Sequence, residues 1–176
     1  MGKKWSGTSL PYVLPNPDGQ PDAWTQETAG EQATQELIEV AEIEPPRAVA
    51  EALGLAEGEK VVARRRLMRR DGRPIELTNS YYPLAIARGT GLAEHRKIKG
   101  GAPTLLASLG HHPGRVEETV EVRSTTAAER TALKLDEDEP VLVLLRKTTS
   151  RAHVPMEVSL MTMREGARLR YEIEVD

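Results

Sequence analysis

Apolar and polar residues alternate in several segments of this chain, and a period of two residues is typical of β-strands. In the first such segment, the alternation predicts that Leu37, Glu39, Ala41 and Ile43 lie on one side of a strand. Later segments occur in pairs joined by turn residues, which indicates antiparallel hairpins. The expected strands cover residues 34–44, 61–71, 73–82, 115–123, 140–150, 154–163 and 169–175.

Three short helices are expected between these strands. Two of them have proline near the first residue and end at a glycine, Gly54 or Gly110, which is a common pair of helix boundaries. The third begins with Thr126 and Glu129 at the spacing of a capping box. Helices interspersed with antiparallel strands indicate the α+β fold class. The helices are expected at residues 45–54, 102–112 and 126–135.

The first part of the chain differs from the rest. Residues 1–30 contain four of the twelve prolines and show no helical or strand period, so we expect an extended arm or linker there. Trp5, Tyr12 and Trp24 could each hold this arm against the domain. We therefore expect an arm at 1–30, in which no winged-helix domain is recognisable, and one folded domain at 31–176.

The chain contains an internal repeat. Residues 52–80 align with residues 132–159, and each copy reads as a short helix, an acidic turn and a hairpin. Generic patterning could produce such a likeness, but charged residues recurring at equivalent places are less generic. The matched residues are Ala52-Leu53 with Ala132-Leu133, Val61 with Val141, Arg66 with Arg146, Pro74 with Pro155 and Glu76 with Glu157.

Six arginines fall within the ten positions from Arg64 to Arg73, in the first hairpin. A three-residue turn with Gly72 in a left-handed conformation would place Arg66 opposite Glu76 and Arg64 opposite Thr78. Alternation then separates a polar face from an apolar face. The polar face holds Arg64, Arg66, Glu76, Thr78, Ser80 and Tyr82, and the apolar face holds Val61, Ala63, Leu67, Ile75, Leu77 and Tyr81.

The second hairpin divides in the same way if Arg146 pairs with Glu157. Its apolar face is expected to hold Val141, Val143, Leu145, Met156, Val158 and Leu160. Its mixed face is expected to hold Leu144, Arg146, Thr148, Glu157, Ser159 and Met161.

Two interpretations of the arginines remain open from the pattern alone. In one, both hairpins present Arg64, Arg66 and Arg146 to a shared pocket, where guanidinium groups suit carboxylate or phosphate oxygens. In the other, the charges form an exposed ladder of ion pairs, which contributes little stability. Arg65, Arg69, Arg70 and Arg73 are assigned to solvent and to the turn in either case.

Composition argues against several other functions. The net charge of −3 and the scarcity of aromatic residues (3%) do not suit a nucleic-acid-binding surface. The absence of cysteine excludes thiolate metal sites and cysteine nucleophiles, and the four histidines lack metal-ligand spacing. No apolar run exceeds Val141–Leu145, so we expect a cytoplasmic protein that has no cofactor and does not contact a membrane.

Three stretches together resemble a known family. "VVARRRLMRRDGRPIELTNSYYPLAIARGT", "LLASLGHHPGRVEETVEVRSTTAAERTALKLDEDEPVLVLLRKT" and the closing "RYE" look like a UTRA domain, the ligand-sensing half of GntR/HutC-type bacterial transcription regulators. The similarity spans about residues 32–175. It implies a chorismate-lyase-like fold with a central antiparallel sheet, a homodimer, and a small anionic effector that is phosphorylated or carboxylated.

The resemblance also implies roles for individual residues. In this family a strand motif matching Arg64 and Arg66 holds the anionic group, and glutamates match Glu76 and Glu157. Together with the pattern above, the candidate effector-binding residues are Arg64, Arg66, Glu76, Ser80, Tyr82, Arg146 and Glu157. Where family members often carry an aromatic residue, this chain has Met163.

The chain also differs from the family in the part that binds DNA. Family members normally begin with a winged-helix domain, so DNA binding is expected only through such a domain and not through this chain. The function expected is therefore effector sensing without enzymatic activity. A chorismate-lyase-like enzyme and a dimerisation module without a ligand are the alternatives.

Overall fold

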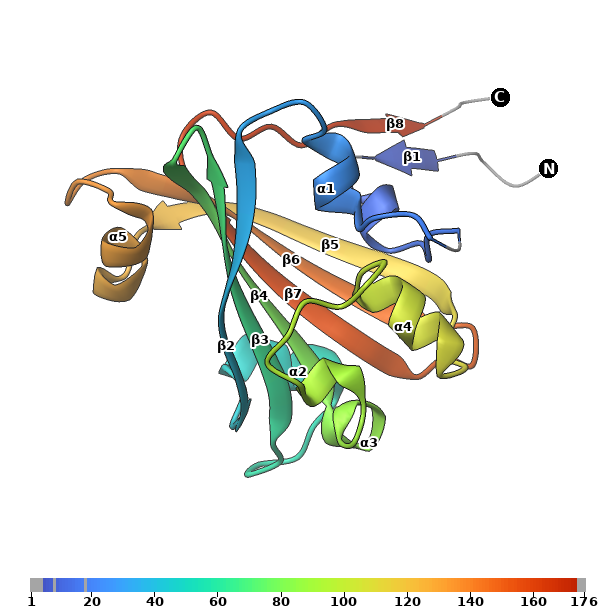
Figure 1. The fold of residues 1–176 in the computed structure, drawn as a ribbon. Helices are drawn as coiled ribbons and strands as arrows, with labels where there is room; N and C mark the ends of the chain where they lie inside the picture. Colours follow the sequence, from blue (N-terminus) through green and yellow to red (C-terminus); the bar gives the residue numbers. More distant parts are fainter. Residues whose placement is uncertain (1–4, 8, 18, 174–176) are drawn as a thin grey trace.

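The computed structural model describes residues 5–7, 9–17 and 19–173. An antiparallel six-stranded sheet in the order β2-β3-β4-β7-β6-β5 forms its centre, and β1 and β8 pair separately (Figure 1). The expected α+β class, with a chorismate-lyase-like sheet, is confirmed. The strands are β1 (Trp5–Gly7), β2 (Ala33–Ile43), β3 (Val61–Arg70), β4 (Arg73–Pro83), β5 (Pro113–Ser124), β6 (Pro140–Ser150), β7 (Pro155–Met163) and β8 (Tyr171–Ile173).

Helices lie on both faces of the large sheet. On one face α2 packs through Val49 and Leu53, and α5 packs through Leu133, against the apolar sides of β3, β4, β6 and β7. On the other face a separate apolar cluster joins Tyr82 and Leu106 to α3 and η2. The helices are η1 (Leu10–Tyr12), α1 (Ala23–Glu27), α2 (Arg47–Leu53), α3 (Leu84–Ala87), η2 (Gly91–Ala93), α4 (Ala102–Ser108) and α5 (Ala127–Leu133).

The internal repeat is confirmed as a structural unit. Each half consists of a strand, a short helix and a hairpin, and the two halves meet where β4 pairs with β7. The acidic turns agree in atomic detail, because Glu59 accepts a hydrogen bond from the Ala56 amide (2.6 Å) and Glu139 accepts one from the Asp136 amide (2.7 Å). The sheet is therefore built from two copies of one local design.

The predicted register of the first hairpin was wrong by two residues. The turn has two residues, Asp71 and Gly72, with φ angles of 52° and 73°, as a type I′ turn requires. One extra residue on β4, Ile75, forms a bulge, so that Arg66 lies opposite Thr78 and not opposite Glu76. Arg64 correspondingly lies opposite Ser80 and not opposite Thr78. A shift of two residues preserves the faces, so the predicted polar face is confirmed.

The second hairpin contains the equivalent bulge. Arg146 lies opposite Ser159, and not opposite Glu157 as predicted, because Met156 is the extra residue on β7. The bulge also moves Met156 out of the expected apolar face. Its side chain packs in the cluster on the opposite face, beside Val62 and Tyr82.

Strand β2 has a bulge as well, and it breaks the predicted common side. Leu37 lies opposite Arg66 and Val40 opposite Arg64, so Ile38 is the extra residue. Leu37 faces the polar side of the hairpin, whereas Ile43 packs with the apolar cluster around α2. The expectation that Leu37 and Ile43 share one side was therefore wrong.

The described residues among the first thirty are more ordered than the expected extended arm. They form β1, which pairs with β8, and η1 and α1, which lie on the same side of the sheet as α4 (Figure 1). Trp24 is buried, as proposed for an anchor of the arm, while the side chain of Trp5 lies outside the described residues. The side chain of Asp22 accepts a hydrogen bond from the Thr25 amide and so caps the start of α1. The proline-rich pattern of this segment did not indicate this helix.

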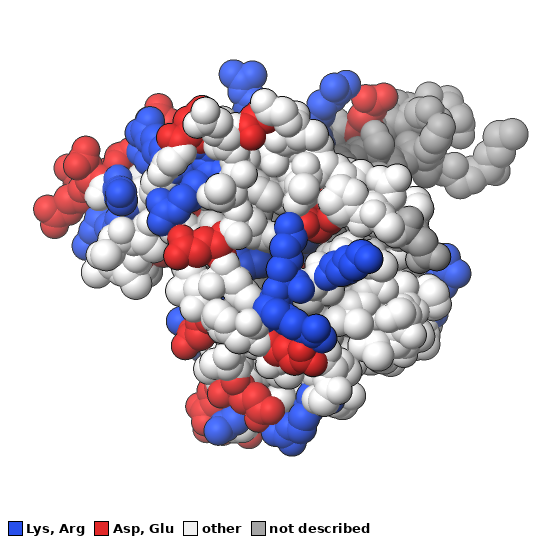
Figure 2. Space-filling model, in the orientation of Figure 1, with Lys and Arg blue, Asp and Glu red and all other residues white. Residues whose placement is uncertain are grey.

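Basic side chains gather in the middle of the face that carries α1 and α4 (Figure 2). The segment between η2 and α4 contributes three exposed cations, Arg96, Lys97 and Lys99. Within the part of the chain that the structure describes, no helix is long and apolar enough to cross a membrane.

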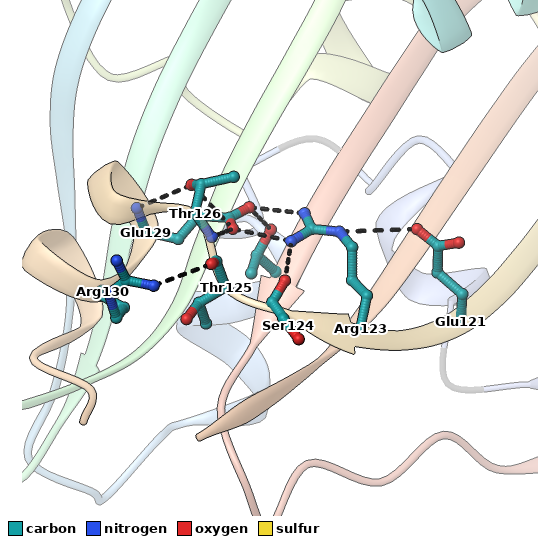
Figure 3. Close-up of polar contacts among 8 residues, drawn as sticks. Glu121, Arg123, Ser124, Thr125, Thr126, Glu129 and Arg130 are labelled. Carbon is teal, nitrogen blue, oxygen red and sulfur yellow. Dashed lines mark hydrogen bonds and ion pairs between the residues drawn. The ribbon is translucent and has the colours of Figure 1, made fainter. Parts of the chain in front are cut away.

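Glu129 joins the second helix–hairpin unit to the sheet (Figure 3). Its carboxylate accepts two hydrogen bonds from Arg123 (2.7 and 2.9 Å), one from the Thr126 amide (2.9 Å) and one from Thr162 on β7 (3.1 Å). The expected capping box is confirmed. The Arg123 guanidinium, with these further donors, lowers the pKa of Glu129 to about 2.

We predict that Glu129→Gln lowers the free energy of unfolding by about 2 kcal/mol at neutral pH, because charge-assisted bonds to Arg123 are lost. The folded-state pKa is depressed, so this stabilisation is present above about 4.5, the ordinary pKa, and is lost as pH falls toward 2. Denaturant unfolding should therefore show a difference between the two proteins that shrinks below pH 4.5. Glu137→Gln, in the exposed turn, is the control, and an equally large effect there would contradict the assignment.

Candidate anion-binding site

A cavity of about 240 Å³ lies between the sheet and the N-terminal arm. The polar faces of both hairpins form its floor, and the segment 97–103 and the arm form the remaining walls. Of the predicted site residues, the cavity brings together Arg64, Arg66, Glu76, Tyr82, Arg146 and Glu157, while Ser80 lies beneath Arg66. The pattern of alternation therefore identified a real concave site, and not a solvated face.

Arg146 is the most unusual of these residues. Its side chain lines the cavity and is only 6% exposed. Within residues 5–7, 9–17 and 19–173, none of its guanidinium nitrogens has a hydrogen-bond or ion-pair partner. A buried cation without such a partner costs stability, and protein interiors rarely keep one.

Arg66 is held by a chain of side-chain hydrogen bonds that crosses from β4 to β7. Its Nη2 donates to Ser80 Oγ (2.7 Å), which lies 2.8 Å from Ser159 Oγ, and Ser159 donates to Glu157 (2.7 Å). Since the Ser159 proton goes to Glu157, Ser80 must donate to Ser159. Tyr82 also donates to Glu157 (3.2 Å), while Nε of Arg66 is buried without a partner.

Arg64 is used differently from the other two arginines. Its guanidinium donates to the carbonyl oxygens of Leu92 (2.9 Å), Glu94 (2.8 Å) and Arg96 (2.7 Å), with a longer bond to Gly91. Burial lowers its pKa below the ordinary arginine value. Arg64 therefore borders the cavity but uses its donors to hold the segment between η2 and α4.

Glu76 modulates the charge of the cavity. Burial raises its pKa above that of an ordinary glutamate, although the Thr78 hydroxyl, Arg66 and Arg146 act in the opposite direction. The carboxyl group consequently takes up a proton more readily than an exposed glutamate does. As the pH falls, the cavity becomes more positive and more favourable for an anion.

The remaining arginines of β3, which were assigned to solvent and to the turn, form ion pairs on the outer side of the hairpin. Arg65 pairs with Glu39 (3.0 Å), Arg69 with Glu36 (3.4 Å) and Arg70 with Glu31 (2.8 Å), on the side of the neighbouring strand and its flank. The alternative interpretation, an exposed ladder made by Arg64, Arg66 and Arg146, is not seen in the part of the chain that the structure describes. The inner arginines border the cavity, and the outer ones face solvent and glutamates.

Sequence reasoning missed the walls supplied by the arm. Tyr12 donates to Glu27, and burial together with this bond raises the pKa of the Tyr12 phenol. Trp24 also lines the cavity, and its buried Nε1 has no hydrogen-bond partner within the described residues. Only the isolated aromatic residues in a proline-rich segment signalled that the arm packs on the domain. Apolar side chains complete the lining, including Leu37, Leu144, Met161, Met163 and Leu169.

The chemistry of the cavity is that of anion recognition. The guanidinium groups of Arg66 and Arg146, the side chains of Tyr12 and Tyr82, and an apolar wall line it. Such a lining suits a small molecule with a negatively charged end. No cluster of three or more residues suited to holding a metal ion occurs in the part of the chain described. The fold and this cavity together define a small α+β domain with a concave site on one face of its sheet.

The chain belongs to the UTRA domain family, whose family model matches residues 28–167. An uncharacterized HTH-type transcriptional regulator of Streptomyces coelicolor is 32% identical over 112 residues, which is 62% of this chain and 42% of that protein. The match thus spans less than half of the length of this curated relative.

Solved structures share the fold. The effector domain of PhnF from Mycobacterium smegmatis superposes with a TM-score of 0.67 at 22% identity, covering 86% of this chain and 92% of that one. The C-terminal domain of the histidine utilization repressor from Pseudomonas syringae gives a TM-score of 0.67 at 20% identity, covering 82% and 99%. The predicted family and fold are therefore confirmed.

We predict that Arg64→Ala lowers the free energy of unfolding by about 3 kcal/mol, because the buried carbonyl oxygen of Leu92 and the part-buried ones of Glu94 and Arg96 lose their donor. Hydrogen exchange should accelerate in the segment 91–96. Arg66→Ala is the matched control, since it leaves that segment bonded. If Arg64→Ala left exchange in 91–96 unchanged, the structural role of Arg64 would be refuted.

Proposed function

We propose that this chain is the effector-binding domain of a GntR/HutC-type transcription regulator and that it binds a small anionic metabolite in the cavity. The observation that carries the proposal is Arg146, a buried guanidinium group without a protein partner at the cavity wall. The buried, unpartnered Nε of Arg66 supports it. An anion on these two side chains would supply the missing hydrogen bonds.

The cost of burying a charge favours a ligand-binding role for Arg146 over a stabilising role. A cation kept in place for stability alone would have carboxylate partners, as Arg123 has in Glu129. Glu157 is near but accepts from Tyr82 and Ser159, and Glu76 accepts from Thr78 and has a raised pKa. The protein's own acidic groups therefore leave positive charge for a ligand.

The lining restricts the kind of effector. Leu144, Met161 and Met163 offer an apolar wall next to the arginines. The volume, about 240 Å³, suits a small metabolite and not a large cofactor. We infer a compact phosphorylated or carboxylated molecule with a short body that packs on this wall.

The regulatory role rests on the family and its structural neighbours. An effector domain of this kind would act on DNA through a separate domain and would form a homodimer, as regulators that read symmetric operators do. Binding and release of an effector, and not turnover, is the activity that we propose. A chorismate-lyase-like reaction has no specific observation in its favour.

We predict that Arg146→Met weakens binding of the effector that a thermal-shift screen of phosphorylated and carboxylated metabolites identifies. Loss of one buried charge-assisted contact costs about 2–3 kcal/mol, or roughly 30- to 150-fold in affinity measured by calorimetry. The same substitution should raise the stability of the ligand-free protein by about 1–3 kcal/mol, because it removes a buried, unpaired cation.

Arg65→Ala serves as the control, since Arg65 lies on the outer side of the hairpin and pairs with Glu39. Its effect on affinity should be less than about threefold. Unchanged binding by Arg146→Met would refute the site, and so would a variant that is both ligand-free and less stable than wild type.

A further inference from the structure

The residues that close the cavity lie mostly outside the segment that matches the family model. That match begins at residue 28, whereas Ser9, Tyr12, Trp24 and Glu27 line the cavity. We call residues 9–17 and 19–28 the lid. The floor of the cavity therefore lies within the matched segment, and most of the lid lies before it.

Polar contacts at two points hold the lid closed. The Asn16 amide N–H donates to Thr104 Oγ1 (3.0 Å), and Asn16 Nδ2 donates to the Gly100 carbonyl (3.1 Å). Asp22 forms an ion pair with Lys97 (2.9 Å). Although burial opposes it, the pKa of Asp22 lies below the ordinary value because Lys97 and Thr25 donate to the carboxylate.

The lid packs closely against the domain at Gly101. Gly101 has a φ of 85°, and a Cβ added to it would lie 3.3 Å from Asp22 Cβ. Glycine is suited to such a close approach in the left-handed region. The segment 97–101 is therefore shaped to receive α1.

Two aromatic residues of the lid, Tyr12 and Trp24, line the cavity. Trp24 is 7% exposed and has an indole N–H without a partner in the described part of the chain. Tyr12 donates to Glu27, and the negative charge of Glu27 contributes to the raised pKa of Glu76 on the cavity floor. A buried donor without a partner costs free energy that a ligand acceptor would recover.

We propose that the lid is the second half of the effector site: it closes over the bound anion, and Trp24 Nε1 donates a hydrogen bond to a second acceptor on the effector. The proposal rests on the proposed function, because it assumes that the cavity holds an anion. In this proposal the arginines bind the anionic group of any effector, and the lid determines which anionic molecules bind best. Effectors with an acceptor beyond the anionic group bind more tightly than inorganic phosphate.

The first test needs no ligand. The sequence has two tryptophans, so Trp5→Phe leaves Trp24 as the single reporter of fluorescence. In that background, Asn16→Ala and Lys97→Met should each raise the acrylamide quenching constant of Trp24 about threefold or more, because each removes lid contacts. Arg47→Ala, at an exposed ion pair on α2, should leave quenching unchanged. Equal quenching in all four proteins would overturn the lid.

The second test uses inorganic phosphate and 3-phosphoglycerate, which adds a carboxylate acceptor. Phosphate should slow hydrogen exchange of the Thr25, Gln26 and Thr28 amides, and Asn16→Ala should speed phosphate dissociation roughly tenfold. Trp24→Phe should weaken 3-phosphoglycerate roughly tenfold and phosphate less than twofold. Phosphate binding with unchanged exchange, or equal losses for both probes, would overturn the proposal.

The two proposals fail in different ways. If calorimetry shows that wild type binds neither probe while Asn16→Ala and Lys97→Met still expose Trp24, the mobile lid stands and its role as part of an anion site is overturned. If phosphate binds through Arg146 but the lid variants change neither quenching nor dissociation, the anion site stands and the lid is refuted.

Discussion

The antiparallel pairing of β4 with β7 is the constraint on which the rest of the structure depends. It joins the two halves of the repeat and sets Ser80 directly opposite Ser159. Their hydroxyl groups then connect Arg66 on one hairpin with Glu157 on the other. A slip of one residue at this seam would turn the polar side of one hairpin toward the apolar cluster, and the shared cavity would be lost.

Three arginines of similar appearance in the sequence have three different roles, and burial explains the division. Arg64 satisfies backbone carbonyls, Arg65 pairs with an exposed glutamate, and Arg146 is buried without a partner. We expect the stability of the domain to depend on the first, to depend little on the second, and to be reduced by the third. Stability given up at one position is a common sign of a binding function.

The sequence was sufficient for the fold class, the repeat and the two faces of each hairpin, because alternation is a local property. Registers were not predictable to the residue, since the bulges at Ile75 and Met156 follow from turn geometry and packing that the pattern does not encode. Which donors of Arg64 are occupied also depends on a segment thirty residues away. The contribution of the arm was missed because its hydrogen bonds with Gly100 and Thr104 join residues more than eighty positions apart in the sequence.

The pairing of β1 with β8 has a consequence for the kinetics of the lid. Gly7 lies opposite Tyr171, so the chain is held just before the lid as well as just after it, where β2 joins the sheet. A segment tethered at both ends samples only a small volume when its contacts break. Its effective concentration near the segment 97–104 stays high, and a handful of hydrogen bonds is then enough to favour closure. In the proposed site, reclosure would be a short intramolecular search, and the residence time of an effector would depend on how often the lid opens as well as on its contacts with the arginines.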